Sequence, residues 1–422
     1  MTDLTRRTIL AASAGVTAAG LVTPAAAQSE PPALFGSVKD GKVELPPLHG
    51  PSEGGGTIAN PLPPGKRLGV AVVGIGHLTL EQIIPGFGSA KRVRLAALVS
   101  GHREKALAVA AEHGVPETHV YDYKSFDAIK DNPDVDIVYI VLPNALHPEF
   151  TERAAIAGKH VLCEKPMAAD VVGAERMIKA CRTAGRKLMI AYRLQYNAVH
   201  RALIKTARDR TYGDLRFIEA VNGQNDAANG QWRQIKALAG GGSLPDVGLY
   251  CLNAFRYITG EEPVEVTGRI TQPKYDPRFR EIEDIATFTL RFPSGVLGSG
   301  SSGYSFHESR QLRCMAADAW FGIDPAFSYN GLVMHIGKKA GDATGREERT
   351  WSPKNQFAVE MDAFAEAIAA GREPHTPGEE GLQDMKIMAA IYESAAGGGG
   401  AVKLPASSGL DATRGPLPSS EG

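Results

Sequence analysis

An acid, a base and a proline, Glu164, Lys165 and Pro166, stand directly after a run of three apolar residues in the segment VLCEKPMAA, residues 161–169. If the run is a buried parallel strand, Lys165 lies at its carboxyl end and points into the crevice where ligands of open α/β sheets bind. A positive charge there can stabilise negative charge that develops on a substrate oxygen. Glu164 is expected to pair with a cofactor or a backbone group, and Pro166 to fix the turn. The alternative is that Lys165 is a surface charge.

An acid and a tyrosine stand four positions apart in the segment GGGSLPDVGLY, residues 240–250. This spacing places Asp246 and Tyr250 on one face if the segment is a loop that feeds a helix. Carboxyl and phenol groups are among the side chains that transfer protons in enzymes. Taken alone, however, a tyrosine on a helix face is by default a packing residue.

The first strongly apolar run is LGVAVVG, residues 68–74. It ends in one glycine, and a second glycine follows two positions later. Gly74 and Gly76 lie where this strand would pass into a helix, and Thr79 occupies the place of the third glycine of a dinucleotide fingerprint. Because the pattern opens a helix within a strand–helix–strand series, it indicates a pyrophosphate at the helix N-terminus. The alternative is a tight glycine turn without a ligand.

The end of the second strand indicates which dinucleotide binds. A site for NAD carries Asp or Glu there to bind the ribose hydroxyls, whereas this strand ends in VSGHREK, with no carboxylate at its tip. Ser100, Arg103 and Lys105 would accept a 2′-phosphate that a carboxylate would repel, so NADP is the expected cofactor. Alternatively, Arg103 and Lys105 belong to the solvated face of the next helix.

The elements that position these residues alternate regularly from residue 68 to residue 192. Near-continuous apolar runs predict strands covered on both faces. The expected strands are 68–74, 92–100, 119–123, 135–143, 159–165 and 187–192. The expected helices are 80–87, 104–114, 148–157 and 173–185. This alternation predicts an α/β fold with an N-terminal doubly wound parallel sheet, the Rossmann arrangement.

The rhythm changes after Arg193. A helix near 197–208 is followed by strands joined by short turns, which predicts a C-terminal α+β domain with a mostly antiparallel, open-faced sheet. The expected strands are 215–223, 264–270, 284–292, 295–305, 311–317 and 319–324. Two late helices, at 355–370 and 380–395, are expected to pack back on the body.

The start of the chain has the composition of an export signal. Arg6 and Arg7 precede an apolar stretch and a small-residue cleavage site at 25–27. A twin-arginine signal peptide and a periplasmic protein, exported folded, are therefore predicted. A retained membrane anchor is the alternative, which the shortness of the apolar stretch disfavours. The predicted segments are the signal peptide 1–27, a proline-rich arm 28–66, an NADP-binding domain 67–192, a substrate and oligomerisation domain 193–402, and a flexible tail 403–422.

The overall composition argues against several classes of function. With 422 residues, 43% of them hydrophobic, the chain can build two domains. Its formal net charge is -1, so a nucleic-acid partner is not expected. The four cysteines have no paired spacing, so no metal site is expected. They are interpreted as small buried hydrophobes, with a periplasmic disulfide as the alternative.

Taken together, the motifs resemble those of the Gfo/Idh/MocA oxidoreductases. The resemblance spans about residue 68 to about residue 402 and includes VLPNALH (141–147), AGKHVLCEKPMA (157–168) and GGGSLPDVGLYCLNAFRYITGEEPVEV (240–266). Family members often have histidine at the position of Tyr250. With a tyrosine at this position, the sequence resembles the glucose–fructose oxidoreductase branch of the family.

The resemblance implies an NADP-dependent sugar oxidoreductase with Lys165, Asp246 and Tyr250 as catalytic residues. Tyr250 would accept and donate a proton, Lys165 would polarise the substrate oxygen and favour the phenolate, and Asp246 would orient the sugar hydroxyl or the pair. The residues implied around the cofactor are Gly74, Gly76, Ser100, Lys105, Tyr123, Asn144, His147, Glu164, Lys165, Arg193, Trp232 and Arg233.

Some of these assignments have simpler alternatives. Asn144 and His147 are expected on the nicotinamide side, although a histidine at a helix start is often only a neighbour of the cap. Trp232 and Arg233 are expected to close over ribose or sugar, but they could equally form a stacked structural pair.

The resemblance further implies NADP bound so tightly that it never leaves. An aldose such as glucose would leave as its lactone, and a second sugar such as fructose would leave as a polyol, sorbitol, with ping-pong kinetics. Export supports retention, because the periplasm offers no soluble NADP pool. The alternatives are an aldose–aldose oxidoreductase, another NADP-dependent sugar dehydrogenase, or a catalytically silent sugar-binding protein. A homo-oligomer, dimer or tetramer, and no stable membrane anchor are expected.

Overall fold

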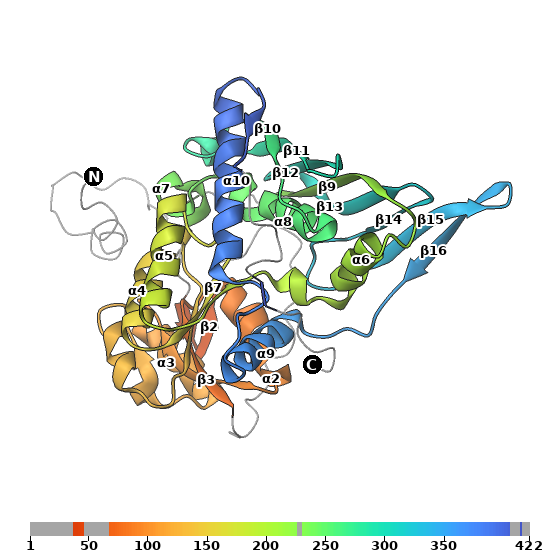
Figure 1. The fold of residues 1–422 in the computed structure, drawn as a ribbon. Coiled ribbons are helices and arrows are strands. Elements are labelled where there is room, and N and C mark those ends of the chain that lie inside the picture. Colours follow the sequence, from red (N-terminus) through yellow and green to blue (C-terminus); the bar gives the residue numbers. More distant parts are fainter. Residues whose placement is uncertain (1–36, 46–66, 226–229, 406–413, 416–422) are drawn as a thin grey trace.

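The structure is a computed structural model that describes residues 37–45, 67–225, 230–405 and 414–415. The predicted signal peptide lies outside the described residues, as do most of the proline-rich arm and most of the tail. None of the described helices combines the length and the apolar character that a membrane span requires. Figure 1 shows two α/β bodies with the long helix α10 (Gly378–Ala396) packed between them.

The first body contains a six-stranded sheet in the order β5–β4–β3–β6–β7–β8, and all of its strand pairs are parallel. Its strands are β3 (Leu68–Val73), β4 (Val93–Val99), β5 (Val120–Tyr121), β6 (Ile137–Ile140), β7 (His160–Glu164) and β8 (Leu188–Ala191). Val70 and Val72 are buried in the core on one face, and Ala71 and Val73 in the core on the other. Helices cover both faces, and the predicted doubly wound parallel sheet is confirmed.

The helices of the first body follow the predicted alternation. They are α2 (Ile84–Ser89), α3 (Arg103–His113), α4 (His147–Ile156) and α5 (Val171–Thr183). A π-helical turn, Thr79–Ile83, precedes α2, so the single helix predicted at 80–87 consists of two parts. A further helix, α9 (Gln356–Ala369), comes from late in the chain, and its Phe357 and Phe364 pack in the same core as Val70. The first body is therefore completed by a segment that the sequence places in the second.

The second body contains a nine-stranded sheet in the order β16–β15–β14–β13–β9–β12–β11–β10–β17. Its strands are β9 (Leu215–Asn225), β10 (Glu265–Thr271), β11 (Ile285–Arg291), β12 (Leu297–Gly303), β13 (Ser305–Ala316), β14 (Ala319–Ile323), β15 (Met334–Ala340), β16 (Ala343–Arg349) and β17 (Val402–Lys403). The pair β12–β9 is parallel and the other pairs are antiparallel. The predicted mostly antiparallel sheet is confirmed.

One face of this sheet carries the helices. Those that contact its strands are α6 (Ala198–Arg208), α8 (Leu249–Thr259) and α10, while the short helix α7 (Lys236–Ala239) contacts the turn Asn144–Leu146 of the first body. In β11 the side chains alternate, with Phe288 and Leu290 buried while Thr287 and Thr289 are exposed. Phe255 of α8 packs against Phe288, with ring centroids 6.4 Å apart. The period of two along β11 thus separates a helix-covered face from an exposed one.

The hairpin of β15 and β16 was not predicted from the sequence. Figure 1 shows it projecting from the end of the sheet. Apart from Met334, Ile336 and Gly337, most of its residues are partly or fully exposed, so its sequence lacks the hydrophobic alternation that indicates a strand. It pairs with the edge of β14 through backbone hydrogen bonds, which do not depend on side-chain type.

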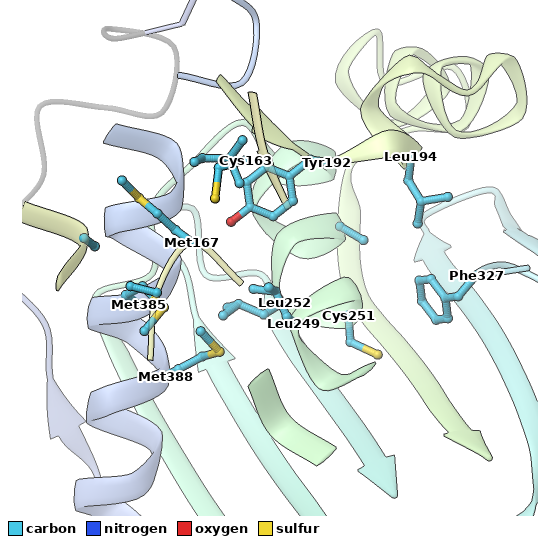
Figure 2. Close-up of a cluster of buried hydrophobic side chains, with 14 of the residues drawn as sticks. Cys163, Met167, Tyr192, Leu194, Leu249, Cys251, Leu252, Phe327, Met385 and Met388 are labelled. Carbon is cyan, nitrogen blue, oxygen red and sulfur yellow. The ribbon is translucent and has the colours of Figure 1, made fainter. Parts of the chain in front are cut away.

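A shared hydrophobic cluster joins the two bodies. Figure 2 shows Cys163 and Met167 of the first body beside Leu252 of α8 and Met385 and Met388 of α10. All four cysteines of the chain are buried and free, as expected of small hydrophobes. Within the described residues, no three His, Cys, Asp or Glu side chains gather in a group that could hold a metal ion.

The described residues of the two terminal segments contact the rest of the protein. Strands β1 (Ser37–Lys39) and β2 (Lys42–Glu44) form a hairpin within the proline-rich arm, and Val43 packs on the core beneath α3. In the segment predicted to be a flexible tail, β17 pairs with β10 and Arg414 is buried against Glu380, 2.6 Å away. A buried carboxylate thus holds Arg414 within the predicted tail, most of which lies outside the described residues.

Candidate active site

Lys165 reaches from the first body to the second. It directly follows β7, and its Nζ donates hydrogen bonds to the backbone oxygen of Asp246 at 2.8 Å and to Oδ1 of Asp246 at 3.1 Å. The Lys165–Pro166 peptide is cis. The carboxyl end of a parallel strand thus meets the segment that opens α8, in the crevice where open α/β sheets bind their ligands.

Tyr250 also lies beside the Lys165 ammonium. Asp246 belongs to a π-helical turn, Leu244–Gly248, which continues directly into α8. The Lys165 Nζ lies 4.6 Å from the centroid of the Tyr250 ring. The structure therefore brings Lys165, Asp246 and Tyr250 together, with the lysine in contact with both of the other side chains.

Lys165 and Asp246 each stabilise the charged form of the other. Burial by itself disfavours the ammonium, but Tyr250, Asp246 and Glu164 outweigh it and raise the pKa of Lys165 above its usual value. Burial likewise disfavours the carboxylate, but Lys165 and Arg233 hold the pKa of Asp246 well below its usual range. At neutral pH the site therefore contains a charged pair. Lys165 can supply a positive charge and hydrogen bonds, but it cannot act as a base.

Asp246 has two further partners. Its Oδ2 accepts a hydrogen bond from the Tyr304 hydroxyl at 2.7 Å and lies 3.2 Å from Nε of Arg233. The Arg233 guanidinium in turn lies over the Trp232 ring, 4.6 Å from its centroid. These four side chains and Asn144 line a hollow beside the charged pair. The stacked pair of Trp232 and Arg233, which was one of the two expectations, is present, and it lies beside Asp246.

Sequence reasoning did not identify Tyr304. It follows the strand LGSGSSG, whose small residues indicated only a strand, and no local motif marks the tyrosine as part of a site. A tyrosine directly after a strand that pairs on both edges with long strands could have been considered, since strand ends often carry functional side chains.

Glu164 is turned into the protein. Its carboxylate accepts hydrogen bonds from the Tyr139 hydroxyl at 2.8 Å and from the backbone N–H of Lys165 at 3.2 Å. Burial raises the pKa of Glu164, although Lys165 counteracts this. Of the two expectations for this residue, the backbone contact is the one seen.

His147 is packed within the protein. Its side chain is fully buried; Nε2 lies 2.8 Å from the Leu142 oxygen, and Nδ1 lies 3.1 Å from the Pro166 oxygen. The histidine ties two strand-end loops together. Asn144, also buried, donates to the Ala239 oxygen at 2.8 Å and still borders the hollow beside Asp246.

Arg193 lies beside Tyr250. It is 5% exposed, and its Nε donates to the Tyr250 hydroxyl oxygen at 3.2 Å. The rest of its guanidinium bonds to the backbone oxygens of Phe327 and Ser328 and to the side chain of Gln356. Its hydrogen bonds thus go to the second body and α9, because the chain turns inward after β8.

The glycine turn fits a dinucleotide. Gly74 has φ +97°, and a Cβ at this position would lie 2.1 Å from the Val141 oxygen, so only glycine is accommodated. A Cβ on Gly76 would meet nothing within 4 Å, which leaves open space at the start of the helical segment. The Thr79 hydroxyl donates to the Gly74 oxygen at 2.7 Å and closes the turn in place of a third glycine. An open glycine beside a helix start suits a pyrophosphate.

The end of β4 fits a 2′-phosphate. Ser100 is buried, and its Oγ accepts a hydrogen bond from the His102 amide at 3.1 Å. Lys105 is 6% exposed, and burial lowers the pKa of its ammonium to about 8. Tyr123 lies over Gly101, where an added Cβ would be 3.1 Å from its ring, and burial raises the pKa of Tyr123 to about 12. A buried ammonium is stabilised by a neighbouring anion.

A Rossmann sheet, an open-faced antiparallel sheet and a lysine–aspartate–tyrosine cluster at their junction define a dinucleotide-dependent oxidoreductase with two domains. Comparison with known families agrees. Residues 68–192 match the model of the oxidoreductase family with an NAD-binding Rossmann fold, and residues 200–317 match the Gfo/Idh/MocA C-terminal domain. The chain belongs to the Gfo/Idh/MocA oxidoreductase family, and the predicted family is confirmed.

Three proteins to which the chain is similar show the range of activities among its relatives. D-xylose 1-dehydrogenase [NADP(+)] of Haloarcula marismortui is 31% identical over 337 residues, which is 77% of this chain and 90% of the relative. The crystal structure of aldose-aldose oxidoreductase from Caulobacter crescentus, complexed with glycerol, is 47% identical, with a TM-score of 0.77, covering 80% of this chain and 100% of that one.

The third relative shares the fold. The crystal structure of a 3-ketoreductase from Actinomadura kijaniata with NADP and TDP-benzene is 23% identical, with a TM-score of 0.69, covering 78% of this chain and 98% of that one. The family and these relatives place the chain among nicotinamide-dinucleotide-dependent sugar oxidoreductases, and the predicted class of cofactor is confirmed.

Proposed function

We propose that the protein is a periplasmic sugar oxidoreductase that retains NADP and passes a hydride from one sugar to another. An aldose such as glucose is oxidised to its lactone, and a second sugar such as fructose is reduced to a polyol, sorbitol. The observation that carries the proposal is the contact of Lys165 with both Asp246 and Tyr250 at the carboxyl edge of the parallel sheet. A base, a cation and an orienting carboxylate are the groups that oxidation of a sugar hydroxyl needs.

Residues of this chain would hold the cofactor at two places. Gly74 and Gly76 would approach the pyrophosphate, and Ser100 and Lys105 would bind the 2′-phosphate. NADP, when bound, supplies the acceptor and donor of the hydride. The absence of a carboxylate at the tip of β4 and the name of the NADP-dependent xylose dehydrogenase support NADP over NAD.

The catalytic cluster moves the proton. Tyr250 takes the proton from the sugar hydroxyl in the oxidative half-reaction and returns a proton to the second sugar in the reductive half-reaction. In the described part of the chain, Lys165 Nζ donates to two oxygens of Asp246, so one of its three N–H groups remains for the substrate oxygen. Asp246 orients Lys165 and Arg233 through its two carboxylate oxygens.

A second candidate is an aldose–aldose oxidoreductase, in which both sugars are aldoses. The observation that favours it is the 47% identity to the enzyme of that name from Caulobacter crescentus. The two reactions need the same catalytic cluster and differ only in the second sugar. The twin arginines and the cleavage site support export for either candidate. Export in turn favours a retained cofactor, because the periplasm offers no soluble NADP pool.

The experiment separates these readings. Purified protein is denatured and the supernatant assayed for NADP; native protein is then given glucose with fructose, and glucose with a second aldose, without added nucleotide. Sorbitol supports the first candidate, and an alditol from the second aldose supports the other. Turnover only with added NADP indicates a dissociating dehydrogenase. Bound NADP with no turnover on any pair would refute an enzymatic role.

A tyrosine variant tests the cluster in the same assay. Tyr250→Phe removes the hydroxyl that transfers the proton, so turnover should collapse while NADP stays bound. Tyr275→Phe is the matched control, because Tyr275 is 91% exposed. Activity that survives in Tyr250→Phe would remove Tyr250 from the proton-transfer role.

A further inference from the structure

Arg193 is held at the Tyr250 oxygen by contacts from several elements. Its side chain follows β8 and is buried, with Nε donating to the Tyr250 oxygen at 3.2 Å. Its Nη2 donates to the Phe327 oxygen at 2.6 Å, and its Nη1 donates to the Ser328 oxygen at 3.2 Å and to Gln356 Oε1 at 2.9 Å. These three acceptors are neutral, so these bonds orient the guanidinium without cancelling its charge.

Aromatic rings further restrict the guanidinium. Its central carbon lies 5.0 Å from the centroid of the Tyr250 ring and 4.4 Å from that of the Tyr329 ring. A planar guanidinium that is stacked and bonded at all three nitrogens cannot turn without breaking several contacts. The direction of its Nε–H toward Tyr250 is therefore set by the fold.

We propose that Arg193 is a positioning residue for Tyr250, which directs the hydroxyl proton toward the substrate and stabilises the oxygen when that proton has left. This inference rests on the proposed function. Arg193 can only donate hydrogen bonds, so the hydrogen of the Tyr250 hydroxyl cannot point at it and is left for another acceptor. When Tyr250 gives its proton to a sugar, the bond from the cationic Arg193 then joins two opposite charges and strengthens.

Other titratable groups surround this pair. Lys165 faces the Tyr250 ring from the first body, and Glu164 and Glu360 lie within the electrostatic reach of Arg193. Burial raises the pKa of both glutamates, which favours their neutral forms, and burial lowers the pKa of His200 to about 4. The pKa of Tyr329 is raised to about 12 by burial. Near neutral pH, Arg193 and the charged pair of Lys165 with Asp246 are thus the charges expected to act on Tyr250.

The test compares three substitutions by the pH dependence of kcat/KM. Arg193→Gln removes the charge and should lower kcat about tenfold or more, leave KM for the sugar within about twofold, and move the rise of kcat/KM upward by about 1 pH unit. Arg193→Lys keeps the charge and should restore the pH of the rise while kcat stays reduced. Arg310→Gln is the control, since Arg310 bonds to the Ser328 side chain in the same loop and should leave the pH profile unchanged.

Two measurements keep the test decisive. If Arg193→Gln does not fold, Gln356→Met, which removes one support of the guanidinium, should shift the profile in the same direction by a smaller amount. If the wild type turns over no sugar, the proposed function fails separately. The phenolate absorbance of each protein, after subtraction of its Tyr250→Phe counterpart, then reports the same shift without turnover. A folded Arg193→Gln protein with an unchanged profile, or the same change in Arg310→Gln, would overturn the inference.

Discussion

The most informative single substitution is Asp246→Asn. It keeps the size of the side chain and one acceptor oxygen but removes the negative charge that lies 3.1 Å from Lys165 Nζ and 3.2 Å from Arg233 Nε. Lys165 would still donate to the Asp246 backbone oxygen, so its side chain should stay in the site. What changes is the direction and the strength with which the two cations are held.

The size of the effect follows from the contacts that are lost. A hydrogen bond to a charged group contributes about 1.5–3 kcal/mol. The carboxylate holds two cations, and an amide retains part of each interaction, so we expect a loss of about 2–3 kcal/mol in transition-state stabilisation. Since 1.36 kcal/mol corresponds to about tenfold in rate, kcat/KM should fall roughly 30- to 150-fold.

The assay measures the single-turnover reduction of the bound cofactor by the sugar, which is monitored through the absorbance of the reduced cofactor. The amount of NADP that the protein retains is measured in parallel. Asp276→Asn is the matched control: Asp276 pairs with Arg278 at 2.7 Å and is 18% exposed, against 19% for Asp246, but lies outside the cluster. The control should keep full activity. If the kcat/KM of Asp246→Asn stays within about threefold of the wild-type value, the assigned role is refuted, because the carboxylate charge would then not stabilise the transition state.

Three further predictions concern stability and the cofactor. Arg414→Ala removes one of the two arginines that pair with the buried Glu380, since Arg256 stays 2.7 Å from it, and should lower the free energy of unfolding by about 1.5–3 kcal/mol in urea, whereas Arg182→Ala, with Arg182 75% exposed, should change it by less than about 1 kcal/mol. Equal effects would show that the tail does not anchor the fold. The affinity of cofactor-free protein for NADP should fall from pH 7 to pH 9, since a phosphate binds the ammonium form of Lys105, whose pKa is about 8, while the affinity for NAD stays constant. A flat NADP profile would place Lys105 away from the phosphate. Gly76→Ala should fold normally and lose bound nucleotide, whereas Gly74→Ala should fail to fold, because only at Gly74 would a Cβ collide with backbone, at 2.1 Å; full nucleotide retention in Gly76→Ala would contradict the pyrophosphate assignment.

The parallel sheet was predictable because burial on both faces leaves a direct trace in the sequence. The run Leu68–Val73 is apolar throughout, and Val93–Val99 is apolar except for Arg94, so neither shows a regular polar face. The glycine turn was predictable for a similar reason, since a positive φ at Gly74 excludes other residues. The β15–β16 hairpin left no such trace, because its strands are largely exposed and are held by backbone bonds.

The directions of individual side chains were predicted less well. His147 and Arg193 follow strand ends, where a polar residue suggests a ligand, yet both are buried and bonded within the protein. Tyr304 and Arg414 were not singled out, although both contact carboxylates that the structure buries or half-buries. Their partners are distant in the chain, and local sequence carries no information about such contacts.

The sequence by itself determined the family and most of the strands and helices, because these leave local patterns of burial and backbone conformation, and the resemblance to the family pointed to Lys165, Asp246 and Tyr250. Only the tertiary structure decided that Asp246 also binds Arg233 and Tyr304, and that Arg193 points at the Tyr250 oxygen. Those contacts join segments far apart in the chain, and their geometry arises from the packing of the two sheets against α8, α9 and α10.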